Sequence, residues 1–250
     1  MRIKVVSLNL WHGGRLLEGI LDFIKQENPD ILMCQEAYNG TDPALLERQR
    51  SVETLQKHFA FPAVDFAAAM QSKKLHIDQG NAVFSRFPIS NRDVTFLEGS
   101  YRVQDMVDRA QFPFLPRNLQ HVTLTTSAGE INVFNFHGVW DLDGDNYSDK
   151  RRAMSEIITR ETRGKSRVIL AGDTNAKPTN QAMRNLGQHL VSVFGASLTS
   201  TFNMRRKDNP GYAAAAVDMM YVSHDITVVS KKCPDVDISD HLPLVVELDI

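Results

Sequence analysis

Residues 170–178 read Leu-Ala-Gly-Asp-Thr-Asn-Ala-Lys-Pro and follow the apolar pair Val168 and Ile169. The apolar run predicts a buried strand that ends in a turn of small residues. Side chains two positions apart share one face of an extended segment, so Asp173 and Asn175 can point into one cleft. In layered α/β folds such clefts lie at the carboxyl ends of strands. Taken alone, however, an Asp and an Asn in a turn are ordinary turn residues.

Five other apolar runs also carry a polar side chain at one end. The polar residues are Asn9, Glu36, His137, Asp218 and the pair Asp240-His241, beside the runs 5–8, 31–35, 131–136, 219–222 and 242–248, respectively. Together with Asp173 they predict a single site built from strand ends. Because these positions span most of the chain, we expect one domain that covers residues 1–250.

Composition limits the class of protein. The chain has 250 residues, 42% of them hydrophobic, and can bury a large core. Its net charge of −2 offers no global attraction to polyanions, so such a substrate must be met by a local basic patch or by metal ions. The two cysteines, Cys34 and Cys233, exclude a disulfide framework and a cysteine-based zinc site.

Location and partners follow from what the sequence lacks. The residues after Met1 do not form the apolar segment of a signal peptide, and no run approaches the ~18 apolar residues of a membrane span. We therefore expect a cytoplasmic protein without a membrane span. Nothing in the sequence indicates an obligate protein partner.

The first half of the chain mixes helices with strands. Strands expected at 3–8 and 31–36 flank a helix, so they should be parallel neighbours. A second helix is expected from Pro43 to about Phe59. Short strands are expected near residues 64–69, 81–84, 94–97, 119–125 and 131–137. The stretch 101–117, with Asp105, Asp108 and Arg109, shows no period and is predicted to be a long ordered loop.

The second half continues the same mixture. Helices are expected at 149–162 and 179–186, with strands at 167–171 and 190–193. Residues 219–223 and 226–229 are expected to form a hairpin. Helical crossovers around many antiparallel strands predict two stacked sheets with helices outside. The acidic run 141–145 lacks the Gly and Glu that an EF-hand requires and predicts a solvated connector.

The ordered set of motifs resembles the endonuclease/exonuclease/phosphatase superfamily, which has the DNase I-like fold. The shared landmarks are Asn9 with Trp11, Gln35-Glu36, His137, Gly172-Asp173-Thr174-Asn175, Val217-Asp218 and Ser239-Asp240-His241-Leu242-Pro243. They occur in the family's order between positions 9 and 243. The resemblance implies a four-layer α/β sandwich, with two mixed β-sheets packed face to face and helices outside. It also implies a metal-dependent phosphoric ester hydrolase.

The residue types suit metal-assisted hydrolysis of a phosphoester. A phosphodiester is anionic, so catalysis must neutralise charge and supply a deprotonated water. Glu36 and Asp240 offer hard oxygen ligands for Mg²⁺ or Mn²⁺. The resemblance makes Glu36 the principal metal ligand, with Asn9 beside it.

The expected catalytic residues are Asp173, Asn175, Asp218, His241 and His137. Asp173 would orient and deprotonate the attacking water, and Asn175 would hold water or a phosphate oxygen. His241, paired with Asp218, would donate to the phosphoryl oxygens, because a carboxylate on one ring nitrogen favours the imidazolium. His137 would be a second donor or would protonate the leaving oxygen.

The substrate is less well defined by the sequence. The leading interpretation is a Mg²⁺-dependent phosphodiesterase or phosphatase that acts on nucleic acid, with Arg205 and Arg206 contacting substrate phosphate. The resemblance implies that abasic-site endonucleases carry a Tyr at the position of His137. The His at this position therefore disfavours an abasic-site endonuclease. The alternatives are a lipid or small-molecule phosphoesterase, similar to sphingomyelinases or inositol phosphatases, and a non-catalytic binding module. The retained acidic residues disfavour the binding module.

Overall fold

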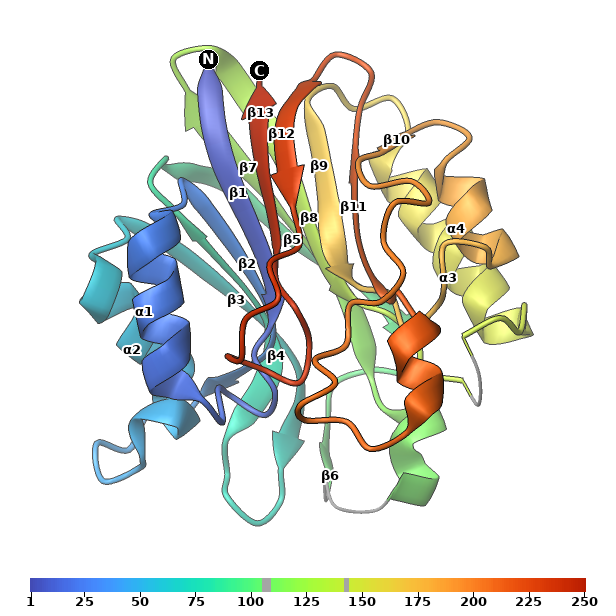
Figure 1. The fold of residues 1–250 in the computed structure, drawn as a ribbon. Coiled ribbons are helices and arrows are strands. Elements are labelled where there is room, and N and C mark those ends of the chain that lie inside the picture. Colours follow the sequence, from blue (N-terminus) through green and yellow to red (C-terminus); the bar gives the residue numbers. More distant parts are fainter. Residues whose placement is uncertain (105–108, 142–143) are drawn as a thin grey trace.

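The computed structural model describes residues 1–104, 109–141 and 144–250, which form two stacked β-sheets with helices outside (Figure 1). Asp105 and Asp108 of the predicted loop, and residues 142 and 143 of the acidic run, lie outside the described residues. The predicted four-layer arrangement is confirmed. Within the described ranges, no helix is long and apolar enough to cross a membrane.

The first sheet has seven strands in the described part of the chain, in the order β12-β13-β1-β2-β4-β3-β6. Their bounds are β1 Arg2–Asn9, β2 Ile31–Asn39, β3 Ala63–Ser72, β4 Asp78–Ser85, β6 Arg102–Gln104, β12 Thr227–Lys232 and β13 Leu244–Asp249. Strands β1 and β2 are parallel, as a helical crossover requires. Helices α1 (Leu17–Glu27) and α2 (Ser51–Phe59) cover the outer face of this sheet (Figure 1).

The second sheet has six strands among the described residues, in the order β10-β11-β9-β8-β7-β5. Their bounds are β5 Ile89–Glu98, β7 Arg117–Thr126, β8 Gly129–His137, β9 Val168–Asp173, β10 Val191–Ser192 and β11 Asp218–Val222. Strands β8 and β9 are parallel, and helix α3 (Asp149–Thr162) makes the crossover between them. Together with α4 (Gln181–Leu186) it covers the outer face (Figure 1).

Buried amides tie the two sheets together across an otherwise apolar interior. Gln35 Nε2 in β2 donates to Asn135 Oδ1 in β8 at 2.7 Å, and Asn135 Nδ2 donates to the Cys34 carbonyl at 3.0 Å. Asn81 Nδ2 in β4 donates to Asn118 Oδ1 in β7 at 2.8 Å. Since buried polar groups are costly when unpaired, these pairs favour one placement of the first sheet on the second.

The predicted helix from Pro43 starts later than expected. A 3₁₀ turn, η1 (Glu47–Arg50), precedes α2, and residues 43–46 are not helical. The Asp42 carboxylate accepts the N–H of Ala44 at 2.8 Å, and this local turn competes with the first helical turn. The predicted loop 101–117 also contains regular structure, namely β6 and the 3₁₀ helix η2 (Arg109–Phe114).

The predicted hairpin of residues 219–223 and 226–229 is wrong. Strand β11 pairs with β9 in the second sheet, whereas β12 pairs with β13 in the first. The connection between them is tied to the start of β9, because the Asp225 carboxylate accepts the N–H of Arg167 at 2.9 Å. Two adjacent short strands with a polar turn predict a hairpin, yet here the chain crosses from one sheet to the other.

Candidate active site

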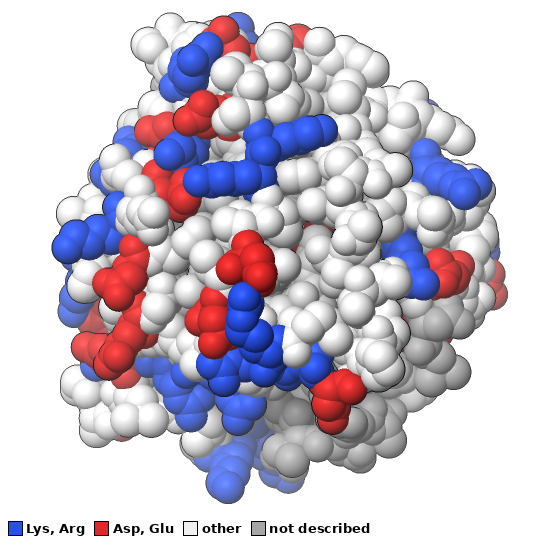
Figure 2. Space-filling model, viewed as in Figure 1, with Lys and Arg blue, Asp and Glu red and all other residues white. Residues whose placement is uncertain are grey.

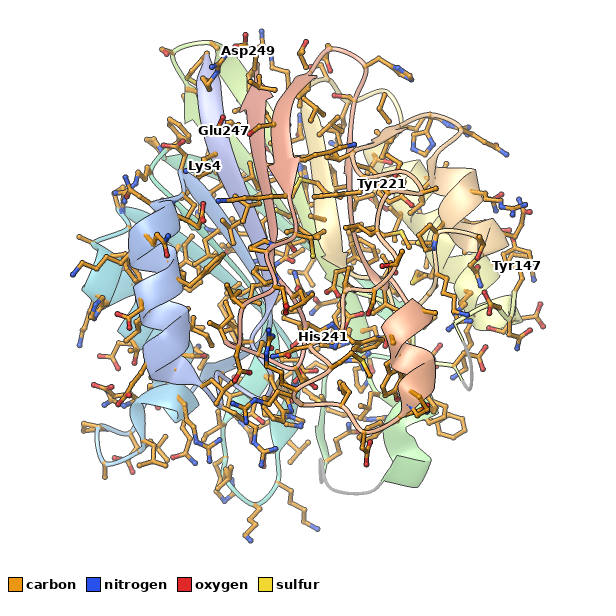
Figure 3. All side chains as sticks on the ribbon, viewed as in Figure 1. Lys4, Tyr147, Tyr221, His241, Glu247 and Asp249 are labelled. Atoms are coloured by element: carbon orange, nitrogen blue, oxygen red, sulfur yellow. The ribbon has the colours of Figure 1, made fainter. Side chains whose placement is uncertain are left out.

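The polar side chains predicted from strand ends meet at one end of the sandwich. Figure 3 shows His241 in its lower part, away from Lys4, Glu247 and Asp249 at the other end. Strands β1 and β2 end here from the first sheet, and β8 and β9 end here from the second. Gly172 lets β9 approach β8 closely, since a Cβ at that position would lie 1.8 Å from the Phe136 carbonyl oxygen.

Asn9, the last residue of β1, lies between two carboxylates from different sheets. Its Nδ2 donates to Glu36 Oε1 at 3.3 Å and to Asp173 Oδ2 at 3.0 Å. Its Oδ1 accepts the N–H of Trp11 at 2.9 Å, which fixes the orientation of the amide. The amide therefore holds the two acidic groups together while separating their charges.

Glu36 is directed into the site by an irregularity in β2. The pairing of β2 with β4 shifts register between Cys34 and Ala37, and Glu36 has a positive φ of 55°. Its Oε2 accepts the N–H of His12 at 2.8 Å. Burial raises the pKa of Glu36, but the charge of His12, the His12 N–H and the charge of Arg117 oppose burial, and the pKa is lowered to about 2. Glu36 is therefore ionised at neutral pH.

Asp173, the last residue of β9, is almost completely buried. Its Oδ1 accepts the N–H of Asn175 at 2.9 Å, and its Oδ2 lies 3.5 Å from His137 Nε2 and 3.7 Å from His241 Nε2. Burial raises the pKa of Asp173 to about 6, against the opposing charge of His241. A base with a pKa near neutrality is suited to accept a proton from water. The Asn175 side chain donates to the Gly138 carbonyl at 3.0 Å.

His241 is held by a carboxylate. Its Nδ1 lies 2.9 Å from Asp218 Oδ2, and both side chains are buried. Burial alone would lower the pKa of His241, but the Asp218 and Asp173 carboxylates outweigh it and raise the pKa to about 10. The centroid of the Phe202 ring lies 4.7 Å from the centroid of the imidazole. His241 is therefore an imidazolium at neutral pH, with Nε2 facing Asp173.

The loop before β11 reaches the site through a lysine. Lys207 Nζ donates to Asp240 Oδ2 at 2.5 Å and lies 5.2 Å from the Phe202 ring. Arg205 and Arg206, predicted to bind substrate, instead make bidentate contacts with Asp235 and Asp237, respectively, with distances of 2.6–2.8 Å. Their role in substrate binding stays a prediction.

Arg117 is a site residue that the sequence did not reveal. This first residue of β7 is 7% exposed, and its guanidinium contacts His137 Nδ1 at 3.2 Å. A small cavity beside it is also lined by Glu36, Met70, Gln79 and His137. The stretch before Arg117 shows no periodicity, so nothing in the sequence distinguishes it from a surface arginine. Lys207 was likewise visible only as part of a basic triplet.

Two neighbouring groups offer metal ligands. Asp173, Asp218 and His241 place one ligand atom each within 4.8 Å of one another, an arrangement that can hold a metal ion. The Glu36 carboxylate offers an oxygen-ligand alternative on the other side of Asn9, whose amide nitrogen donates to Glu36 and to Asp173. Mg²⁺ prefers oxygen ligands, and an imidazolium has no free lone pair to bind a metal. The donor chemistry therefore fits Mg²⁺ best at Glu36.

Comparison with known proteins identifies the family of the chain. A model described as the endonuclease/exonuclease/phosphatase family matches residues 6–241. The chain belongs to this family. No protein with a curated description matches the sequence.

Several solved structures share the fold at low sequence identity. An endonuclease/exonuclease/phosphatase from Beutenbergia cavernae is 19% identical with a TM-score of 0.74 over 100% of this chain and 72% of that one. A mannosyl-6-phosphatase from Bacteroides thetaiotaomicron is 20% identical, with a TM-score of 0.69 over 99% and 100%. The human Nocturnin catalytic domain with bound sulfate is 17% identical, with a TM-score of 0.69 over 99% and 94%. The predicted DNase I-like fold is thus confirmed.

Proposed function

We propose that the protein is a Mg²⁺-dependent phosphoesterase that hydrolyses phosphodiester bonds in nucleic acid by in-line attack of water. The observation that carries this proposal is the convergence of donors on Asp173 Oδ2. Asn9 Nδ2, His137 Nε2 and His241 Nε2 all lie within 3.7 Å of this one oxygen. Donors that surround an anionic position can also hold the oxygens of a phosphoryl group.

Glu36 would hold Mg²⁺, with Asn9 beside it and Asp240 as a further ligand. The low pKa of Glu36 keeps its carboxylate ready to bind a cation at neutral pH. A bound Mg²⁺ supplies neutralisation of the phosphate charge. Lys207, which holds Asp240 Oδ2, would have to release that oxygen for Asp240 to become a ligand.

The other side chains divide the remaining work. Asp173 accepts a proton from the attacking water while the water oxygen forms a bond to phosphorus. The backbone N–H of Asn175 donates to Asp173 Oδ1 and stabilises the orientation of this carboxylate. His241 donates Nε2–H to a phosphoryl oxygen, because Asp218 occupies its Nδ1. The bond from phosphorus to the leaving oxygen breaks as the new bond forms, and the leaving alkoxide takes up a proton from solvent water.

Basic residues around the site support a polyanionic substrate. Figure 2 shows Lys and Arg gathered over the lower part of the molecule, where this end of the sandwich lies. The turn between β3 and β4 extends from this end and carries the exposed Lys73 and Lys74, and Arg15 and Arg102 are also exposed. Local positive charge attracts nucleic acid even though the net charge is −2.

A panel of substrates tests the proposal. Purified protein with Mg²⁺ is assayed against single- and double-stranded DNA, RNA, a 5′-phosphotyrosyl oligonucleotide, sphingomyelin, an inositol phosphate and mannose 6-phosphate. We expect metal-dependent cleavage of an oligonucleotide. We also expect Asp173→Asn to cut turnover by ~10²-fold or more while substrate binding is kept.

Asp93→Asn is the matched control, because this β5 carboxylate is 62% exposed and distant in the fold from the strand ends that form the site. It should keep full turnover. If only the sugar phosphate, the inositol phosphate or the lipid is hydrolysed, the substrate is a small-molecule or lipid phosphoester and not nucleic acid. An absence of Mg²⁺-dependent turnover throughout the panel would overturn the proposal.

A further inference from the structure

Arg117 places a hydrogen-bond donor against a ring nitrogen of His137. The guanidinium Nη1 lies 3.2 Å from His137 Nδ1. A guanidinium has donors at every nitrogen and keeps its proton in proteins, so it cannot accept a hydrogen bond. His137 Nδ1 must therefore be the acceptor, and a neutral imidazole that accepts at Nδ1 carries its proton at Nε2.

We propose that Arg117 is a positioning residue that fixes His137 as the neutral Nε2–H tautomer. His137 then donates a hydrogen bond to a substrate oxygen and does not protonate the leaving group. The role in the reaction rests on the proposed phosphoester hydrolysis, whereas the tautomer follows from the contact with Arg117. Of the two roles that the sequence left open for His137, this selects the donor.

The two imidazoles at the site are held in opposite ways. His241 Nδ1 faces the Asp218 carboxylate at 2.9 Å, which requires a proton on that nitrogen. His137 Nδ1 faces a cation instead. Burial, followed by the charge of Arg117, lowers the pKa of His137 well below its usual value. Their Nε2 atoms nevertheless point at the same oxygen of Asp173, at 3.5 and 3.7 Å.

The surroundings of Arg117 indicate that it is not a structural ion pair. Among the described residues its Nε is buried without a hydrogen-bond partner, and no carboxylate lies within salt-bridge distance of it. Burial lowers the pKa of Arg117, while the charges of Glu36 and Asp173 oppose this shift. Burying a cation costs desolvation free energy unless partners offset it. The hydrogen bond to His137 Nδ1 is one such partner for Arg117.

The tautomer can be observed without any turnover. Metal-free protein labelled with ¹³C and ¹⁵N at histidine gives a Cδ2 chemical shift that separates the Nδ1–H and Nε2–H forms, and His137→Gln assigns the signal. We expect the Nε2–H form in the wild type at neutral pH, and loss of this preference in Arg117→Met. An imidazolium or an Nδ1–H form in the wild type would overturn the proposal, whatever the enzyme hydrolyses.

Kinetics then tests the consequence for the reaction. We expect Arg117→Met to lower kcat by ~10–100-fold with a small change in KM, as for other groups that orient a reacting side chain. The double variant with His137→Gln should be no slower than His137→Gln alone, because both changes remove one function. Fully additive losses, or an unchanged kcat in Arg117→Met, would contradict the assignment.

Two further variants complete the design. Arg92→Met makes the same substitution at an exposed β5 arginine, whose Nε lies 3.1 Å from Asp65, and it should change neither the His137 signal nor kcat. Arg117→Lys keeps the charge but has no planar fork of donors. It should retain the fold and recover part of kcat. If Arg117→Met does not fold, the wild-type spectrum and Arg117→Lys still decide the question.

Discussion

Asn9 links the two halves of the site because its amide nitrogen donates to one carboxylate from each sheet. Its neighbours are held in a backbone conformation that L-residues rarely adopt. Trp11, His12, Glu36 and Asn175 all have a φ between 51° and 58°. Such residues cost on the order of 1–3 kcal/mol each, so the surrounding contacts must stabilise them. Their concentration here is typical of a site whose geometry matters more than local stability.

Asn9→Asp tests the separation of charge at this point. The new carboxylate would face Glu36 and Asp173 and should lower the unfolding free energy of metal-free protein by on the order of 2 kcal/mol or more. Mg²⁺ or Mn²⁺ should restore part of the loss, because a cation neutralises the added charge. Thermal unfolding with and without metal measures both effects. Asn9→Ala is the control without charge, and equal behaviour of the two variants would contradict this account.

Glu36→Gln tests the assigned metal ligand. The amide keeps the size of the side chain but removes the negative charge, so we expect a higher Mg²⁺ concentration for half-maximal activity, by ~10-fold or more. A metal titration of turnover measures the shift. An unchanged titration would show that the cation is held elsewhere.

At this scale the sequence was informative where residue types repeat a pattern. Asn9, Glu36, His137, Asp173, Asp218 and His241 each end or open an apolar run, and the structure brings them together. Their individual roles stay predictions. Arg117 could not be found in this way, since its neighbours in sequence carry no period and its partner is twenty positions away, at His137.

Elements were predictable where one segment determines its own structure. The β1-α1-β2 crossover follows from the apolar spacing of one helix between two strands, and the parallel pairing is confirmed. The hairpin predicted at β11 and β12 was wrong because the choice of sheet depends on partners far along the chain. Strand β9 shows what such pairing demands, since Gly172 lies against the backbone of β8.

Gly172→Ala should disrupt this pairing. Its Cβ would lie 1.8 Å from the Phe136 carbonyl oxygen, so β9 must move away from β8. We expect a loss of about 3 kcal/mol or more in unfolding free energy, together with reduced turnover, because Asp173 is the next residue. Chemical denaturation measures the loss. Gly187→Ala is the control, with its nearest neighbour at 3.4 Å, and a comparable loss there would contradict the steric explanation.

At the scale of the whole molecule, basic side chains and the candidate active site lie at the same end of the sandwich. Both sheets contribute acidic groups to the site, and Lys and Arg gather over the lower part of the molecule, where this end of the sandwich lies (Figure 2). This distribution was not visible in the sequence, because a net charge of −2 averages over the two ends. An electrostatic contribution to binding should therefore depend on a few positions near the site and on ionic strength.

Replacing Lys73 and Lys74 together with Gln tests that contribution. We expect weaker binding of a single-stranded oligonucleotide and a plot of log affinity against log salt that is shallower by roughly 1.4, or 0.7 for each lost phosphate contact. The value of kcat should not change. Lys165→Gln is the control, since this exposed lysine precedes β9 at the end remote from Asp173. An unchanged salt slope in the double variant would exclude the turn as a binding surface.

The hydrogen bond between Gln35 and Asn135 has a consequence for how the protein can change over evolutionary time. Both amides are fully buried, so neither can touch a substrate. Apolar packing is non-directional and does not fix the position of one sheet relative to the other, whereas a hydrogen bond is directional. In-line attack tolerates misplacement of well under ~1 Å. Substitutions that accumulate at Gln35 and Asn135 during evolution would thus reduce turnover before they reduce stability. Neither residue lines the site, so an inspection of the site residues alone would miss this cause.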